Sequence, residues 1–189
     1  PSDGQDTYVD AYAPTTNYGT ATTFFFANDG RRGLIQFDLS SLSGATIVTA
    51  TFTLYASSTA GAGAELALNR LLSANVWTEL GATWNTRDGS NAWAGTAGCN
   101  TSGTDYSATL LGLGIVPAHA VGDPFSLTLD NAELVLMISA NRGLRELSNV
   151  FTFWYSSDWT TASQRPTLTI DYMLPTGGGA RRMLMGVGR

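Results

Sequence analysis

The 189-residue sequence has little of the residue types on which most catalytic and metal sites depend. Its single cysteine, Cys99, excludes an internal disulfide and a cysteine-based metal site, and a lone cysteine of this kind is usually buried. Its single histidine, His119, has no recognisable motif around it. Lysine is absent, so all ten basic residues are Arg. No hydrophobic run approaches the roughly 20 residues of a membrane-spanning helix, which argues against a membrane partner.

Few residues could carry a reaction. Hydrolytic and acyl-transfer sites need a base, commonly His, beside a nucleophile or an orienting carboxylate. For His119 a loop or packing role is the better interpretation, with pH sensing as the alternative. The four Glu are scattered, and we expect Glu79 and Glu133 to make structural hydrogen bonds. Phosphate-binding glycine loops and zinc-protease motifs are absent. We therefore predict a protein without a catalytic site and without a cofactor.

Calcium is the one exception left open. Sandwich proteins made of β-strands can bind it through loop carboxylates and carbonyls. The candidate donors are Asp3, Asp6, Asp10 and Asp29, although their spacing follows no recognised pattern. A calcium site therefore stays a prediction without a fixed ligand set.

Charge is divided unevenly along the chain. Residues 1–172 contain seven Arg against fifteen Asp and Glu, a net charge of −8, whereas residues 173–189 contain three Arg and no acid. An acidic body argues against nucleic acid as the partner, because phosphate binding needs clustered cations. The first residues do not form a basic and apolar leader, so we expect a protein made without a secretory signal.

Several segments alternate between apolar and polar residues with period two, as strands with one buried face do. Further strands are expected at residues 65–71, 125–129, 150–155 and 167–172, separated by turns rich in Gly, Asn and Asp. Many short strands with few helices predict one all-β domain over residues 1–172, a jelly-roll-like antiparallel β-sandwich. The expected inward residues of the two clearest segments, 34–39 and 49–56, are Ile35, Phe37, Leu39, Ala50, Phe52, Leu54 and Ala56.

One short helix is expected near residue 130. Asp130 and Glu133 have the spacing of a capping box, and an Asn-Arg-Gly stop follows about ten residues later. Between them, Leu134, Val135 and Ile138 form an apolar stripe. We predict that this helix closes one end of the sandwich.

The sequence resembles the DNRLRE-type domain through segments that occur in that family's order over residues 6–172. The resemblance implies a non-catalytic jelly-roll β-sandwich related to a carbohydrate-binding-module family. Such domains occur in secreted polysaccharide-acting proteins, surface proteins and phage structural proteins, so the ligand stays open. The segments are Asp6-Thr7-Tyr8-Val9-Asp10 with Asn17-Tyr18-Gly19, Leu34-Ile35-Gln36-Phe37-Asp38-Leu39-Ser40, Trp77-Thr78-Glu79 with Thr83-Trp84-Asn85, Tyr155-Ser156-Ser157, and residues 162–172.

Trp93 and Trp159 are the candidate glycan-binding residues. Both lie among polar residues, Trp93 in a long loop expected at residues 85–107, and a large exposed ring among polar residues suggests a partner. Ordinary anchoring of the loops is the alternative for both. We expect Trp77 and Trp84 to belong to the core, because each would bury a large apolar area there.

Residues 173–189 form a glycine-hinged basic and apolar tail. We expect it to dock onto a partner, either by filling a groove or by adding a strand to a neighbouring subunit, while its arginines pair with the neighbour's acids. The candidate docking residues are Arg181, Arg182, Met183, Leu184, Met185 and Val187.

Two functions follow from these features. The first is a structural subunit of a large assembly, a virion head decoration or tail component that forms homo-oligomers or binds capsid or tail proteins through its tail. The alternative is a carbohydrate-binding or adhesion module of a secreted or cell-surface protein, located outside the cell or at its surface. The two are compatible, because the outer domain of a particle can also contact surface glycans.

Overall fold

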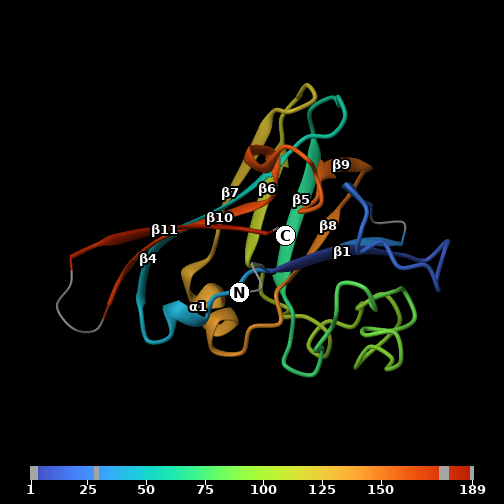
Figure 1. Ribbon diagram of the computed structural model, residues 1–189, viewed down its shortest axis with the longest axis horizontal. Coiled ribbons are helices and arrows are strands. Elements are labelled where there is room, and N and C mark those ends of the chain that lie inside the picture. The colour runs from blue at the N-terminus through green and yellow to red at the C-terminus, as the bar shows by residue number, and fades with distance from the viewer. Residues whose placement is uncertain (1–3, 28–29, 175–178, 188–189) are drawn as a thin grey trace.

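The computed structural model describes residues 4–27, 30–174 and 179–187, and it forms an antiparallel β-sandwich (Figure 1). The first sheet has five strands in the order β1-β3-β8-β5-β6. The second has four, in the order β11-β10-β4-β7, and β2 and β9 pair as a small third sheet. The prediction of an all-β sandwich with one short helix is confirmed.

The strands are short, as the turn-rich sequence predicts. The first sheet contains β1 (Gln5–Asp10), β3 (Arg31–Gln36), β8 (Leu144–Ser148), β5 (Ala64–Arg70) and β6 (Gly112–Val116). The second contains β11 (Arg181–Gly186), β10 (Thr167–Met173), β4 (Thr46–Tyr55) and β7 (Pro124–Thr128). The small sheet contains β2 (Thr23–Phe26) and β9 (Thr152–Tyr155).

The core lies between the two large sheets and contains all seven residues predicted to face inward from residues 34–39 and 49–56. The rings of Phe37 and Phe52 meet edge to face, with their centroids 6.1 Å apart, and so join the two segments. Each large side chain buried in this way contributes about 1.5–3 kcal/mol. The other four predicted strands correspond to β5, β7, β9 and β10, with ends shifted by one or two residues.

The helix α1 (Asn131–Ser139) begins as predicted, because the Asp130 side chain accepts a hydrogen bond of 2.8 Å from the backbone N–H of Glu133. It lies at one end of the sandwich, against β4 and β5 (Figure 1). The predicted stripe needs one correction: Leu134 and Met137 are buried, whereas Val135 is exposed. In the described part of the chain, no helix has the length and apolar character needed to cross a membrane.

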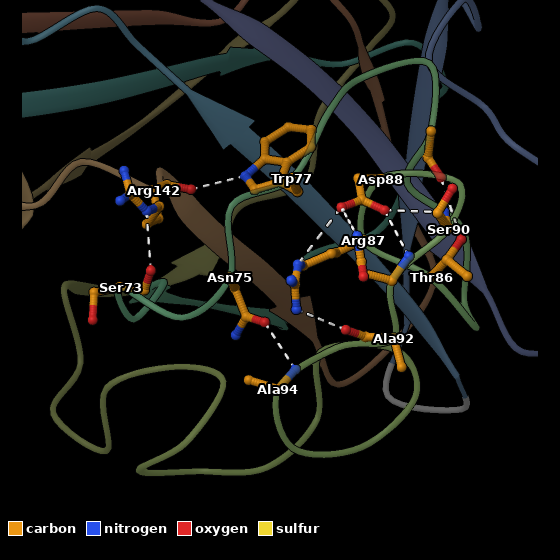
Figure 2. Close-up of polar contacts among 12 residues, drawn as sticks. Ser73, Asn75, Trp77, Thr86, Arg87, Asp88, Ser90, Ala92, Ala94 and Arg142 are labelled. Carbon is orange, nitrogen blue, oxygen red and sulfur yellow. Dashed lines mark hydrogen bonds and ion pairs between the residues drawn. The ribbon is translucent and has the colours of Figure 1, made fainter.

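Residues 72–111 form a long irregular segment between β5 and β6, longer than the loop predicted at residues 85–107. This segment covers part of the outer face of the first sheet and builds a second, smaller core there. Cys99 is buried in it, as predicted, and so is Trp77, whose Nε1 donates to the carbonyl of Arg142 at 2.8 Å (Figure 2). The buried members are Val9, Leu34, Leu71, Trp77, Ala82, Trp93 and Cys99.

A network of side-chain to backbone hydrogen bonds gives this segment its shape. Arg87 donates through Nη1 to the carbonyl of Ala92 at 2.9 Å, and Asn75 Oδ1 accepts from the backbone N–H of Ala94 (Figure 2). The centre of the network is Asp105, whose two carboxylate oxygens accept the backbone N–H groups of residues 95, 96 and 101. Burial alone would raise the pKa of Asp105, but these hydrogen bonds hold it below its usual value.

The described end of the predicted tail, residues 179–187, folds back on its own domain. Its strand β11 pairs antiparallel with β10 and extends the second sheet at one edge (Figure 1). Met183 and Met185 pack against the sandwich core, and Val187 is buried in it. The Arg182 guanidinium pairs with the carboxylate of Asp171 at 2.7 Å. The strand addition therefore occurs within one chain, whereas the sequence predicted docking onto a partner.

We expect Asp105→Asn to destabilise the protein by about 1–2 kcal/mol, because an amide nitrogen would replace one oxygen and leave one or two of these partly buried N–H groups without an acceptor. Urea unfolding followed by tryptophan fluorescence measures the change. Glu65→Gln, at an exposed position on β5, is the control and should leave the urea midpoint unchanged. Equal midpoints for wild type and Asp105→Asn would show that the network contributes little.

Candidate functional site

Exposed aromatic side chains gather beside the small sheet. Phe25 on β2 and Phe153 on β9 are register partners, and their rings stack with centroids 5.6 Å apart. Tyr12 and Phe151 lie beside them. Tyr12 is 67% exposed, Phe151 52% and Phe153 38%, whereas Phe25 is partly buried. We call Tyr12, Phe25, Phe151 and Phe153 the aromatic surface.

Arg31 on β3 holds these rings together. Its guanidinium carbon lies 4.7 Å from the ring centroids of Tyr12 and Phe25 and 5.4 Å from that of Phe151. Contacts of a cation with aromatic faces contribute about 0.5–1 kcal/mol each at exposed sites. Arg31 also pairs with the carboxylate of Asp10 at 3.1 Å, and Asp10 in turn accepts the backbone N–H of Tyr12. These contacts restrict the rings of Tyr12, Phe25 and Phe151.

The aromatic surface also has a rigid support beneath it. The ring of Tyr8 lies 4.8 Å from that of Phe25 and stacks on Tyr18 at 4.1 Å. On the opposite face of the small sheet, Phe24 and Trp154 are buried in the core. A rigid row of exposed rings can stack on the apolar C–H faces of sugar rings with little loss of conformational entropy.

None of the four residues of the aromatic surface was among the binding residues predicted from the sequence. Alternation within residues 23–26 and 151–153 was the signal available, because it places Phe25 and Phe153 on the face opposite to the buried residues. The decisive information was the pairing of β2 with β9, two strands far apart in the chain. That pairing is what makes separate aromatic residues into one surface.

The two tryptophans predicted to bind glycan occupy different environments. Trp159 is partly exposed, stacks on Tyr155 with centroids 4.1 Å apart, and donates through Nε1 to Gln164 at 3.1 Å. Tyr155 is on β9, two residues from Phe153, so Trp159 lies at the other end of the same strand. Trp93 is only 4% exposed, and its Nε1 donates to the carbonyl of Thr83 at 3.0 Å. In this structure the Trp93 ring anchors the loop and offers no free face.

The remaining candidates have structural partners. Glu133 pairs with Arg70 at 2.8 Å, and Glu79 accepts the backbone N–H of Asp6, as expected for structural hydrogen bonds. The ring of His119 stacks on Trp154 at 5.6 Å. Among the tail residues, Arg181 and Leu184 are exposed on β11.

The calcium donors suggested by the sequence do not form one group. Asp10 is occupied by Arg31 and by the N–H of Tyr12, and Asp6 is buried. Asp3 and Asp29 lie outside the described residues. Within residues 4–27, 30–174 and 179–187, no three His, Cys, Asp or Glu side chains come together in a group that could hold a metal ion.

Two acidic side chains lie in the interior instead of on the surface. Asp6 on β1 accepts the backbone N–H of Ser157 at 2.7 Å, yet burial raises its pKa to about 7, helped by the charges of Glu79 and Asp158. Glu146 on β8 is completely buried. Burial raises the pKa of Glu146 well above its usual value, and the nearby charge of Asp6 raises it further.

We expect the free energy of unfolding to fall between pH 5 and pH 8 in buffer without divalent cations. The folded state keeps the proton of Asp6 up to about pH 7, whereas the unfolded chain releases it near pH 4, so stability decreases as pH rises between these values. Urea midpoints at the two pH values measure this. Asp6→Asn keeps an acceptor for Ser157 and should flatten the slope, while the partly exposed control Asp171→Asn should retain it. A steeper slope in Asp6→Asn would contradict the assignment.

Comparison with known proteins identifies the family of the chain. A family model described as carbohydrate-binding module family 96 matches residues 2–109, which is more than half of the chain. None of the curated proteins matches the chain. The matched segment includes β1 to β5 and most of the irregular segment, and it contains Tyr12, Phe25 and Arg31. The chain belongs to carbohydrate-binding module family 96.

Proposed function

We propose that the chain is a non-catalytic module that binds carbohydrate on its aromatic surface, in a secreted or cell-surface protein. The observation that carries this proposal is the exposure of Tyr12, Phe151 and Phe153 on one face, in a domain of a carbohydrate-binding-module family. Soluble proteins seldom expose a contiguous group of large apolar rings unless the group contacts a partner.

The chemistry of the surface fits a sugar better than an apolar ligand. The rings are open to solvent, so a ligand is stacked on them and not enclosed. Polar groups are available at the edge, where the hydroxyl of Tyr12 can exchange hydrogen bonds with sugar hydroxyls. Because Phe153 and Tyr155 are two residues apart on β9, their side chains lie on the same face about 7 Å apart. Trp159 stacks on Tyr155. We therefore include Trp159 as a more distant contact for a longer chain.

Alanine substitution tests the surface. We expect Tyr12→Ala and Phe153→Ala each to weaken polysaccharide binding about tenfold, because the best-packed aromatic contacts carry most of the binding energy at such surfaces. Retention in affinity gels, or a glycan array for ligands not yet identified, measures the loss. Leu184→Ala removes an equally exposed apolar side chain from the second sheet and is the matched control.

Two outcomes would contradict the proposal. One is the absence of binding by the folded wild-type protein to any carbohydrate on the array. The other is binding that both aromatic variants retain in full. If Trp159→Ala alone weakened binding, the contact would lie at the far end of β9 and not on the aromatic surface.

A second candidate function, a subunit of a larger assembly such as a virus particle, has one observation in its favour. The strand β11 lies at the edge of the second sheet, and Leu184 on it is 67% exposed. An edge strand with an exposed apolar residue can pair with a strand of another chain. In this reading the tail both completes its own sheet and extends it to a neighbour.

Leu184→Glu tests this second candidate without disturbing the inward contacts of Met183 and Met185. We expect wild type to self-associate at high micromolar concentration and Leu184→Glu to stay monomeric, as measured by light scattering after gel filtration. The aromatic variant Phe153→Ala should associate like wild type. A wild-type protein that remains monomeric throughout this concentration range would contradict self-assembly through β11.

A further inference from the structure

Glu146 is anomalous among the buried polar groups. Its side chain is completely buried, and neither carboxylate oxygen has a hydrogen-bond partner. A buried carboxylate without partners costs several kcal/mol of stability, so native proteins pair such groups with donors, water or an ion. The Thr152 hydroxyl on β9 is also buried and without a hydrogen-bond partner.

A glycine makes room for this carboxylate. Glu146 pairs with Gly33 on β3, which in turn pairs with Tyr8 on β1. A Cβ at position 33 would clash with Glu146 Oε2 and with the ring of Phe26, because it would lie closer to both than van der Waals contact allows. The Glu146 carboxylate thus lies over Gly33, in the direction of β1, and that strand carries Asp6 on the same face as Tyr8.

Negative charge is concentrated on the Asp6 side of this region. Asp6 experiences the charges of Glu79, from the irregular segment, and Asp158, after β9, while Glu146 experiences the charge of Asp6. Glu79 and Asp158 are only partly buried, so these two carboxylates remain in contact with solvent, unlike those of Asp6 and Glu146. The Asp6 carboxylate therefore lies within electrostatic reach of three other acids, which come from three other parts of the chain.

We propose that the region between Asp6 and Glu146 binds one hard, oxygen-preferring cation, with calcium as the best fit. Glu146 can supply two oxygens and Asp6 one, and hydroxyl groups, backbone carbonyls or water supply the remainder of the six to eight that calcium takes. The two interior carboxylates of Asp6 and Glu146 are the protein's acidic ligands. The more exposed Glu79 and Asp158 contribute negative charge without being ligands. The cation keeps both interior carboxylates ionised. This site is separate from carbohydrate binding and does not rest on it.

Thermal unfolding at pH 8 tests the proposal. Compared with protein in EDTA, we expect 5 mM calcium to raise the melting temperature by at least about 4 °C, because calcium binds the folded state alone. Magnesium should have a weaker effect, since it demands a smaller octahedral site and gives up its water reluctantly. At pH 5 the calcium effect should shrink, because protons compete for both carboxylates.

Glu146→Gln should abolish the response to calcium, whereas Asp171→Asn, an acid on the second sheet, should respond like wild type. If Glu146→Gln fails to fold, Asp6→Asn replaces it. Titration calorimetry of the wild type adds a test that needs no variant, with one calcium bound per chain as the expected result. The proposal is overturned if calcium neither binds nor raises the melting temperature, if magnesium acts equally well, or if Glu146→Gln retains the calcium response.

Discussion

The pairing of β4 with β10 organises the sandwich. It aligns Phe52 with Leu168 and Ala50 with Ile170, so that both strands present their apolar residues on one face, which packs against the first sheet. Strand geometry then decides what lies outside, because neighbouring residues point to opposite faces. The same constraint acts on β2, where burial of Phe24 and Phe26 requires Phe25 to face away from them. Three consecutive phenylalanines cannot all enter one core, and the aromatic surface is a consequence.

The local sequence pattern was sufficient to predict part of this architecture. Alternation identified both faces of β4 because its buried and exposed positions differ sharply in polarity, and the cap at Asp130 identified the start of α1 from neighbouring residues alone. The candidate site was harder to predict from the sequence. Trp93 was a candidate for glycan stacking because its neighbours in sequence are polar, but its ring belongs to a separate small core. That core includes Val9 of β1 and Leu34 of β3, which are distant from Trp93 in sequence.

The strand β8 shows why charged residues mislead a pattern-based prediction. It contains Arg145 and Glu146 side by side, which normally indicates a solvated segment, yet both are buried. β8 lies in the middle of the first sheet, with the sandwich core on one face and the irregular segment on the other. Arg145 is accommodated against the ring of Tyr106, 3.8 Å from its guanidinium carbon. No property of the residues in β8 reveals that both faces are covered.

The interior acid Asp6 shares strand β1 with Tyr8, which supports the aromatic surface. Asp6 and Tyr8 are two residues apart on β1 and project from the same face, and the ring of Tyr8 supports Phe25 from below. A cation that fixes Asp6 would therefore also restrict Tyr8 and reduce the motion of the rings above it. Since stacking on a rigid surface costs less entropy than stacking on a mobile one, ion binding in the interior would favour ligand binding at the surface. The coupling would act through reduced motion of the β1 side chains, without any contact between cation and carbohydrate.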